Sequence, residues 1–159
     1  MYSPKTPQVR TTWLCKFIGI GQLPLIAEAV AARLERSRIL HEAGHRFSMV
    51  IEEPAPHYRL GDNDTMAAQP GYLLTAGALP SVALGIIPSA TPKRPMRPQE
   101  LFHVYDDALV SVELLAARVQ VTQPSEIALY IKAFEQLRSM AVYGADARAL
   151  IVKALDALR

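Results

Sequence analysis

Two apolar segments and the stretch between them decide the fold: FSMVIEE at residues 47–53 and SVALGII at residues 81–87. Apolar residues alternate along the first segment, which predicts a strand, and the second segment predicts a buried strand. The sequence between 62 and 79 has a helical pattern, and Pro70-Gly71 interrupts it, so we expect a kink or a restart there. A strand, a helix and a strand in this order favour two parallel strands joined by a right-handed crossover.

The segments that follow predict antiparallel strands. LFHVY (101–105) and LVSVEL (109–114) flank two aspartates and predict a hairpin, which ARVQV (117–121) extends. Pro124 opens a predicted helix that ends at Gly144, before a last helix. We therefore expect an α/β fold, in which helices pack on a mixed parallel and antiparallel sheet.

The N-terminal part of the chain has a weaker pattern. We expect residues 1–22 to be irregular, because prolines and the GIG of 19–21 interrupt them, and residues 23–159 to form a single α/β domain. A helix is predicted from Leu23 to about Leu40, and Gly44 has the position of a glycine that ends a helix.

The composition excludes several classes of protein. The net charge is +2, and the basic residues Lys93, Arg94 and Arg97 alternate with prolines rather than aromatic residues, so we expect no binding to nucleic acid by this chain alone. Cys15 is the only cysteine, which excludes an internal disulfide and indicates a cytoplasmic protein. The longest uncharged stretch, 65–92, contains prolines and glycines that favour a buried core over a membrane span.

The pentapeptide HEAGH (41–45) fits the H-E-x-x-H pattern of zinc hydrolases, with His41 and His45 as the metal ligands. That chemistry requires both histidines on one face of a helix, one turn apart. Here Gly44 and an alternating strand follow, so His45 is predicted at or beyond the end of the helix. We therefore reject a metal site at these histidines and expect no cofactor.

Candidate functional residues come from two places. In the predicted hairpin, His103 and Tyr105 share one face of a strand, and Glu113 lies on the next strand opposite its apolar neighbours, where Arg59 or Arg118 would be its partner. Histidine exchanges protons near neutral pH, so these three residues would carry acid–base catalysis if the protein is an enzyme. Cross-strand packing and a structural ion pair explain the same residues without a function.

The second group, His57, Tyr58 and Arg59, follows the first strand, and loops at strand ends commonly bind ligands. A structural turn is the simpler explanation. Together with His103, Tyr105 and Glu113, these residues are the predicted ligand-binding set.

Several long stretches resemble one family. They are AARLERSRILHEAGHRFSMVIEEPAPHYRLGDNDTMAAQPGYLL, LPSVALGIIPSATP and FHVYDDALVSVELLAARVQVTQPSEIALYIKAFEQLRSMAVYG. In this order they are similar to the C-terminal domain of actinobacterial Xre-type, antitoxin-like transcriptional regulators, here without the helix-turn-helix. The order of elements also weakly resembles the phospholipase D-like fold, but no HxK motif is present.

The resemblance implies a regulatory effector domain with no established chemistry. It leaves three binding partners open: a second copy in a homodimer, a small partner protein, or a small apolar ligand. The alternative is a stand-alone enzyme evolved from the same scaffold, a cyclase or isomerase using acid–base catalysis. A zinc hydrolase that uses the HEAGH segment is the third and least favoured hypothesis.

Overall fold

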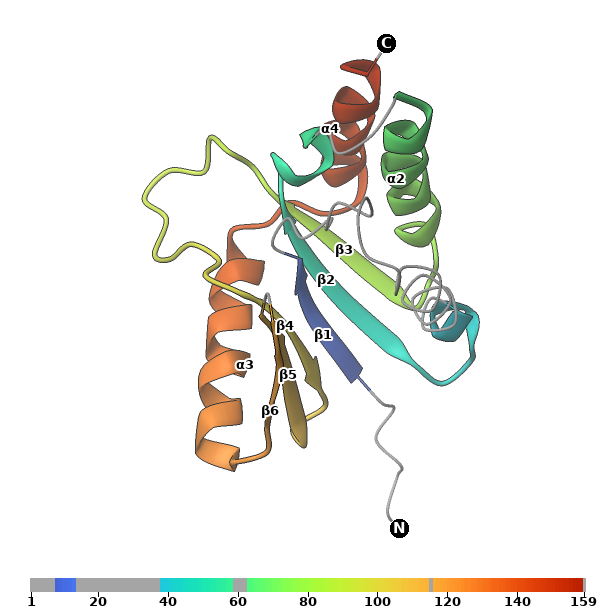
Figure 1. Cartoon of the computed structure of the whole chain (residues 1–159). Coiled ribbons are helices and arrows are strands. Elements are labelled where there is room, and N and C mark those ends of the chain that lie inside the picture. The colour runs from blue at the N-terminus through green and yellow to red at the C-terminus, as the bar shows by residue number, and fades with distance from the viewer. Residues whose placement is uncertain (1–7, 14–37, 59–62, 115, 159) are drawn as a thin grey trace.

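A computed structural model describes residues 8–13, 38–58, 63–114 and 116–158, with side chains from residue 38 onward except those of 63–67. Its strands form one six-stranded sheet in the order β3-β2-β1-β4-β5-β6 (Figure 1). The first three strands along the chain are parallel, and the next three are antiparallel. In chain order the strands are β1 (Gln8–Trp13), β2 (Arg46–Glu52), β3 (Val82–Ile87), β4 (Leu101–Tyr105), β5 (Leu109–Glu113) and β6 (Arg118–Val121).

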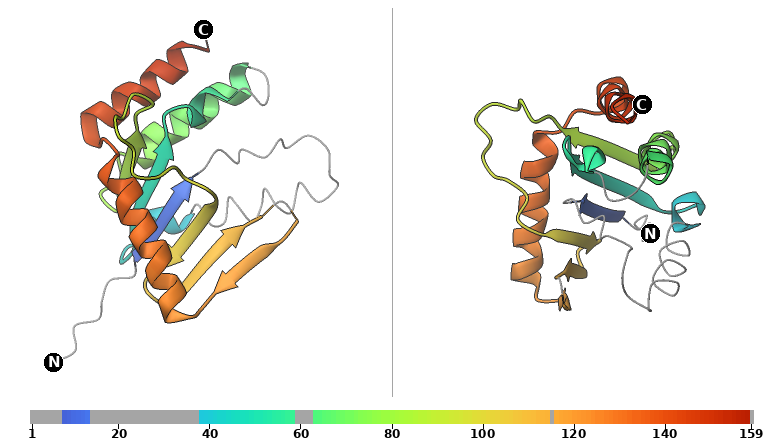
Figure 2. Two further views of the ribbon diagram at one scale, coloured as in Figure 1. Left: turned by 90° about the vertical axis from the view of Figure 1, so that its left-hand side faces the viewer. Right: turned by 45° about the horizontal axis from the view of Figure 1, so that its top comes forward.

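Helices lie on both faces of this sheet, as Figure 2 shows. The described α helices are α2 (Asn63–Ala76), α3 (Pro124–Ser139) and α4 (Gly144–Asp156), and two short 3₁₀ helices are η1 (Ile39–His41) and η2 (Ala55–His57). Helix α3 covers one face, while α2 and α4 cover the opposite face where it is formed by β2 and β3. The expected mixed sheet packed by helices is confirmed.

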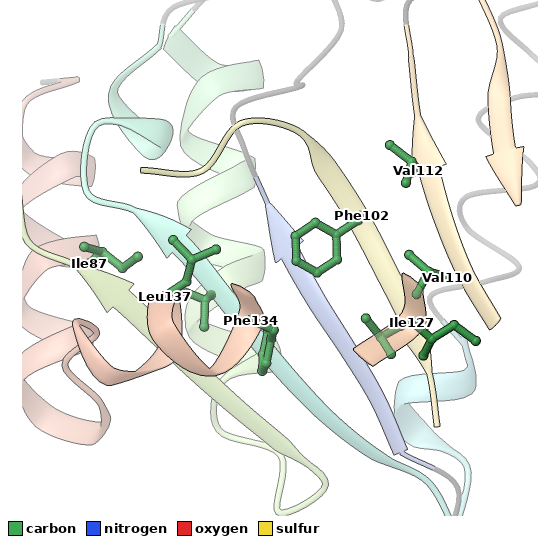
Figure 3. Packing of buried hydrophobic residues seen from close by; sticks show 9 residues of the cluster. Ile87, Phe102, Val110, Val112, Ile127, Phe134 and Leu137 are labelled. Atoms are coloured by element: carbon green, nitrogen blue, oxygen red, sulfur yellow. The ribbon is translucent and has the colours of Figure 1, made fainter. Parts of the chain in front are cut away.

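The larger core lies between α3 and the sheet. Phe134 and Leu137 of α3 are completely or almost completely buried, and they pack against residues of β2 to β5 (Figure 3). Helix α3 begins at Pro124, whose fixed φ suits a first helical position. Its buried residues recur at helical spacing, so one stripe of the helix faces the sheet.

Strand β2 contributes to the cores on both faces of the sheet. Val50 belongs to the core under α3, whereas Phe47 and Ile51 pack on the other side, with α2, α4 and η1. Successive side chains of a strand point to opposite faces, so apolar residues at both odd and even positions of β2 help to bury both faces of the sheet. Helix α2 connects β2 to β3, and these two strands are parallel as predicted.

Residues 8–13 differ from the prediction of an irregular N-terminal segment. They form β1, which pairs with β2 on one side and β4 on the other and so lies in the middle of the sheet. The sequence QVRTTW contains β-branched residues that suit a strand. Six residues next to prolines were too short to show a clear alternation.

Two details of the helices also differ from expectation. Helix α2 continues through Pro70 without a restart, and Pro70 is buried within it. Helix α3 ends at Ser139, before Gly144, and Gly144 is the first residue of α4 with a φ of 58°. Asp146 lies in the first turn of α4. The predicted helix between Leu23 and Leu40 falls mostly outside the described residues.

Candidate functional site

The predicted residues of the hairpin lie on the sheet face opposite α3. Cross-strand pairing places His103 beside Ser111, and Ser111 beside Gln120 on β6. Two residues further along β5, Glu113 pairs with Arg118 of β6. Paired residues share a face, so these side chains form one group, which we call the polar row. Its members are His103, Tyr105, Ser111, Glu113, Arg118 and Gln120.

No described helix covers the polar row. On this face α2 and α4 pack against β2 and β3, at the other half of the sheet (Figure 2). Ser111 is buried, His103 is half-buried, and Tyr105 and Gln120 are exposed. The row therefore combines buried and accessible polar groups, an arrangement that can both bind and orient a partner.

His103 and Tyr105 lie next to each other on β4. Their ring centroids are 6.4 Å apart and the ring planes are inclined by 33°. The two rings present an aromatic surface with polar atoms, which suits a partner that stacks and forms hydrogen bonds.

Glu113 forms an ion pair with the arginine that faces it on β6. Arg118 Nη2 donates to Glu113 Oε1 at 3.1 Å, and the two side chains are 51% and 24% exposed, respectively. Of the two arginines considered as its partner, Arg59 lies outside the described residues. An exposed pair of this kind contributes little to stability, so its main effect is to fix the position of the carboxylate.

The structure contains a second charged group, at the carboxyl ends of β2 and β3. Arg94, in the loop after β3, donates through Nη2 to Glu52 Oε2 at 2.7 Å. Glu52 is the less exposed partner, with 13% of its side chain accessible. Its other oxygen, Oε1, and the Nε of Arg94 are buried without a hydrogen-bond partner among the described residues.

Glu53 anchors the same loop from the next position. Its Oε2 accepts a hydrogen bond of 2.7 Å from the backbone N–H of Ser89, and Lys153 Nζ of α4 lies 3.8 Å from Oε1. The Ser89 backbone hydrogen bond is the main cause that lowers the pKa of Glu53 below 4.5. Burial opposes this shift, while the Ser89 side chain, Lys153 and His57 add to it.

The predicted ligand-binding set is divided between these two groups. His57 ends η2 and is half-buried, Tyr58 is 52% exposed, and Arg59 lies outside the described residues. The strands β1 and β4 separate β2 from β5, a distance of about 14 Å at the usual strand spacing. The residues near Glu53 and those of the polar row therefore form two clusters.

The HEAGH segment does not have the geometry of a zinc site. The helix η1 ends at His41, and Gly44 has a φ of 89°, so the chain turns before His45. The His45 ring stacks on Phe47 with centroids 6.2 Å apart. Within the described ranges, no three His, Cys, Asp or Glu residues lie close enough together to hold a metal ion.

Sequence reasoning missed the buried Ser111 and the Glu52–Arg94 pair. The alternation of LVSVE places Ser111 on the same face as Glu113, and that signal was available. The partner of Glu52 depends on the path of the loop after β3, which has no periodic pattern.

No helix in the described part of the chain is long and apolar enough to cross a membrane.

The fold and the site define a mixed α/β domain with a polar row on one half of its sheet. The chain belongs to the family described as a domain of unknown function (DUF5753), which matches residues 22–153. The central strand β1 precedes the matched residues. No curated protein matches the chain.

Proposed function

We propose that this chain is the effector domain of a transcriptional regulator and acts by binding, not by catalysis. The resemblance to actinobacterial Xre-type, antitoxin-like regulators supports this role, and the membership in DUF5753 is compatible with it. The observation that carries the proposal is the position of the polar row, which no described helix covers.

The side chains of the polar row favour a partner with hydrogen-bonding groups over a small apolar ligand. Gln120 and Tyr105 are exposed, and their amide and hydroxyl groups offer hydrogen-bond donors and acceptors to a partner. An apolar ligand would remove these groups from water without replacing their hydrogen bonds, which is unfavourable.

The alternative is an enzyme that uses His103, Tyr105 and Glu113 for proton transfer. The shared face of these residues favours it, because proton transfer requires groups within reach of one substrate. The Arg118 guanidinium bound to Glu113 favours the binding role, since it occupies the carboxylate that would serve as the base.

Complementation of a deletion strain separates the two functions. In the organism that encodes the chain, we expect the deletion to change transcript levels of a limited set of genes. The wild-type gene restores them, Tyr105→Ala does not, and Leu129→Ala does, because Leu129 is exposed on α3, away from the polar row. Unchanged transcripts together with accumulation of a metabolite would support the enzyme and contradict the regulator. Equal amounts of each variant in the cell, measured by immunoblot, control for folding.

A further inference from the structure

The two edges of the sheet differ. At the β3 edge, Ile86 exchanges two backbone hydrogen bonds with Val142, at 3.0 and 2.8 Å, so the segment before α4 covers that edge. At the opposite edge, β6 pairs with β5, and no other described strand pairs with it. Uncovered edges readily accept another strand, and natural proteins usually protect them.

The hairpin between β5 and β6 fixes which backbone groups point outward. Leu114 N–H donates to the carbonyl of Ala117 at 2.8 Å, so these residues are a hydrogen-bonded pair. Bonded and non-bonded pairs alternate in antiparallel strands, so Val119 and Val121 also bond to β5. Arg118 and Gln120 therefore direct their N–H and C=O groups away from the sheet.

We propose that the outer edge of β6 pairs with β6 of a second copy of this chain, antiparallel and centred on Val119. This inference goes beyond the proposed function, since it concerns the strand edge and holds whatever the polar row binds. The result would be one continuous sheet through two copies, with Arg118 and Gln120 of each copy supplying the new backbone hydrogen bonds.

The side chains of β6 are complementary to themselves in this register. Val119, which is 42% exposed, meets Val119 of the second copy on the sheet face that α3 covers. Val121 meets Ala117 on the same face, and Arg118 meets Gln120 on the other face. A two-fold axis at Arg118 would instead oppose two guanidinium groups, which is unfavourable, so charge selects against that register.

The interface centres on a strand of four residues, from Arg118 to Val121, which makes it smaller than a standard protein interface. We therefore expect a reversible dimer with a dissociation constant of about 10 μM to 1 mM. Sedimentation velocity over this concentration range measures it. A wild-type protein that stays monomeric up to about 1 mM would overturn the proposal.

A pair of charge variants tests the register. Val119→Lys and Val119→Glu each place like charges across the two-fold axis, and each alone is expected to be monomeric. A mixture of the two is expected to form a heterodimer, because opposite charges then meet. If the mixture does not associate, or if either variant dimerises as the wild type does, the pairing at Val119 is wrong. Circular dichroism confirms that both variants fold.

A proline variant tests the backbone hydrogen bonds. Gln120→Pro removes an outward N–H without disturbing the bonds to β5, and edge strands accept proline. Gln120→Ala removes the same side chain but keeps the N–H, so the difference between the two variants isolates the backbone donor. Two hydrogen bonds are lost per dimer, and we expect Gln120→Pro to raise the dissociation constant about tenfold above that of Gln120→Ala. Equal constants would contradict strand pairing.

Hydrogen exchange of the dilute monomer reports whether the edge is already occupied. We expect the amides of Arg118 and Gln120 to exchange quickly and those of Val119 and Val121 slowly, with protection of the first pair appearing as concentration rises. Slow exchange of Arg118 and Gln120 in the monomer would mean that another part of the same chain pairs with β6, which would overturn the proposal.

Discussion

At the scale of single residues, the glycines show where the fold requires the absence of a side chain. A Cβ at Gly85 on β3 would lie 2.7 Å from Tyr143 Cζ and 2.9 Å from Ala141 Cβ. The segment 141–143 therefore approaches β3 closely, and it also forms the hydrogen bonds that cover the β3 edge. Apart from its chain neighbours and the backbone of its own helix, Gly71 in α2 has no atom within 4 Å of such a Cβ.

We expect Gly85→Ala to lower the free energy of unfolding by about 1–3 kcal/mol, because the tyrosine ring and Ala141 must move. Gly71→Ala is the control, and we expect it to raise stability by about 0.5–1 kcal/mol, since alanine is favoured over glycine within a helix. Urea denaturation followed by circular dichroism measures both changes. A Gly85→Ala protein as stable as the wild type would contradict the close contact with Tyr143.

Glu53 predicts a pH dependence of stability. Its pKa in the folded state is lowered below 4.5, mainly by the Ser89 backbone hydrogen bond, so its contribution is complete above pH 4.5. That contribution is lost as the pH falls through the folded-state pKa. We expect Glu53→Gln to reduce the loss of stability in acid, measured by denaturation between about pH 2 and 7. Glu135→Gln is the matched control, because it removes an exposed carboxylate of α3. If stability falls in acid by the same amount in Glu53→Gln and in the wild type, Glu53 does not contribute to the pH dependence of stability.

At the scale of elements, the loop between β3 and β4 is held at both ends by acidic side chains. Glu52 and Glu53 bind its first half, and Tyr130 OH of α3 donates to Glu100 Oε1 at 2.7 Å at its other end. Burial, followed by the Glu100 hydrogen bond, raises the pKa of Tyr130 to about 12. The loop is thus attached to the sheet and to α3.

The ion pairs of Arg94 and Arg118 differ in burial, and we expect their removal to differ in cost. Arg94→Ala leaves the mostly buried Glu52 carboxylate without its cation, so we expect a loss of about 1–3 kcal/mol. Arg118→Ala breaks a more exposed pair, and we expect a loss below about 1 kcal/mol. Thermal or urea denaturation compares the two. A loss for Arg118→Ala as large as that for Arg94→Ala would show that exposure does not determine the strength of these pairs.

The sequence predicted the elements whose patterns are local. Alternation identified β2 and the β4–β5 hairpin, and Pro124 marked the start of α3. The same period of two placed His103 and Tyr105 on one face. The sequence did not identify β1, because the stability of this short strand comes from partners far along the chain. It also did not predict the pairing of Glu52 with Arg94, because an irregular loop brings the two residues together.

At the scale of the whole molecule, β1 joins the parallel and antiparallel halves of the sheet. Thr12 pairs with Val50 on one side and with Phe102 on the other, so both halves depend on the same six residues. Val50 and Phe102 also belong to the core under α3. The two halves of the sheet therefore share one core as well as one strand.

The central position of β1 has a consequence for synthesis of the protein. The ribosome makes β1 before any other described strand, yet its partner β4 emerges only after β2, α2 and β3. Until then the nascent chain carries a strand with one side unpaired, and pairing over such a separation in sequence is slow. β1 can therefore gain its second partner only after β4 has left the ribosome.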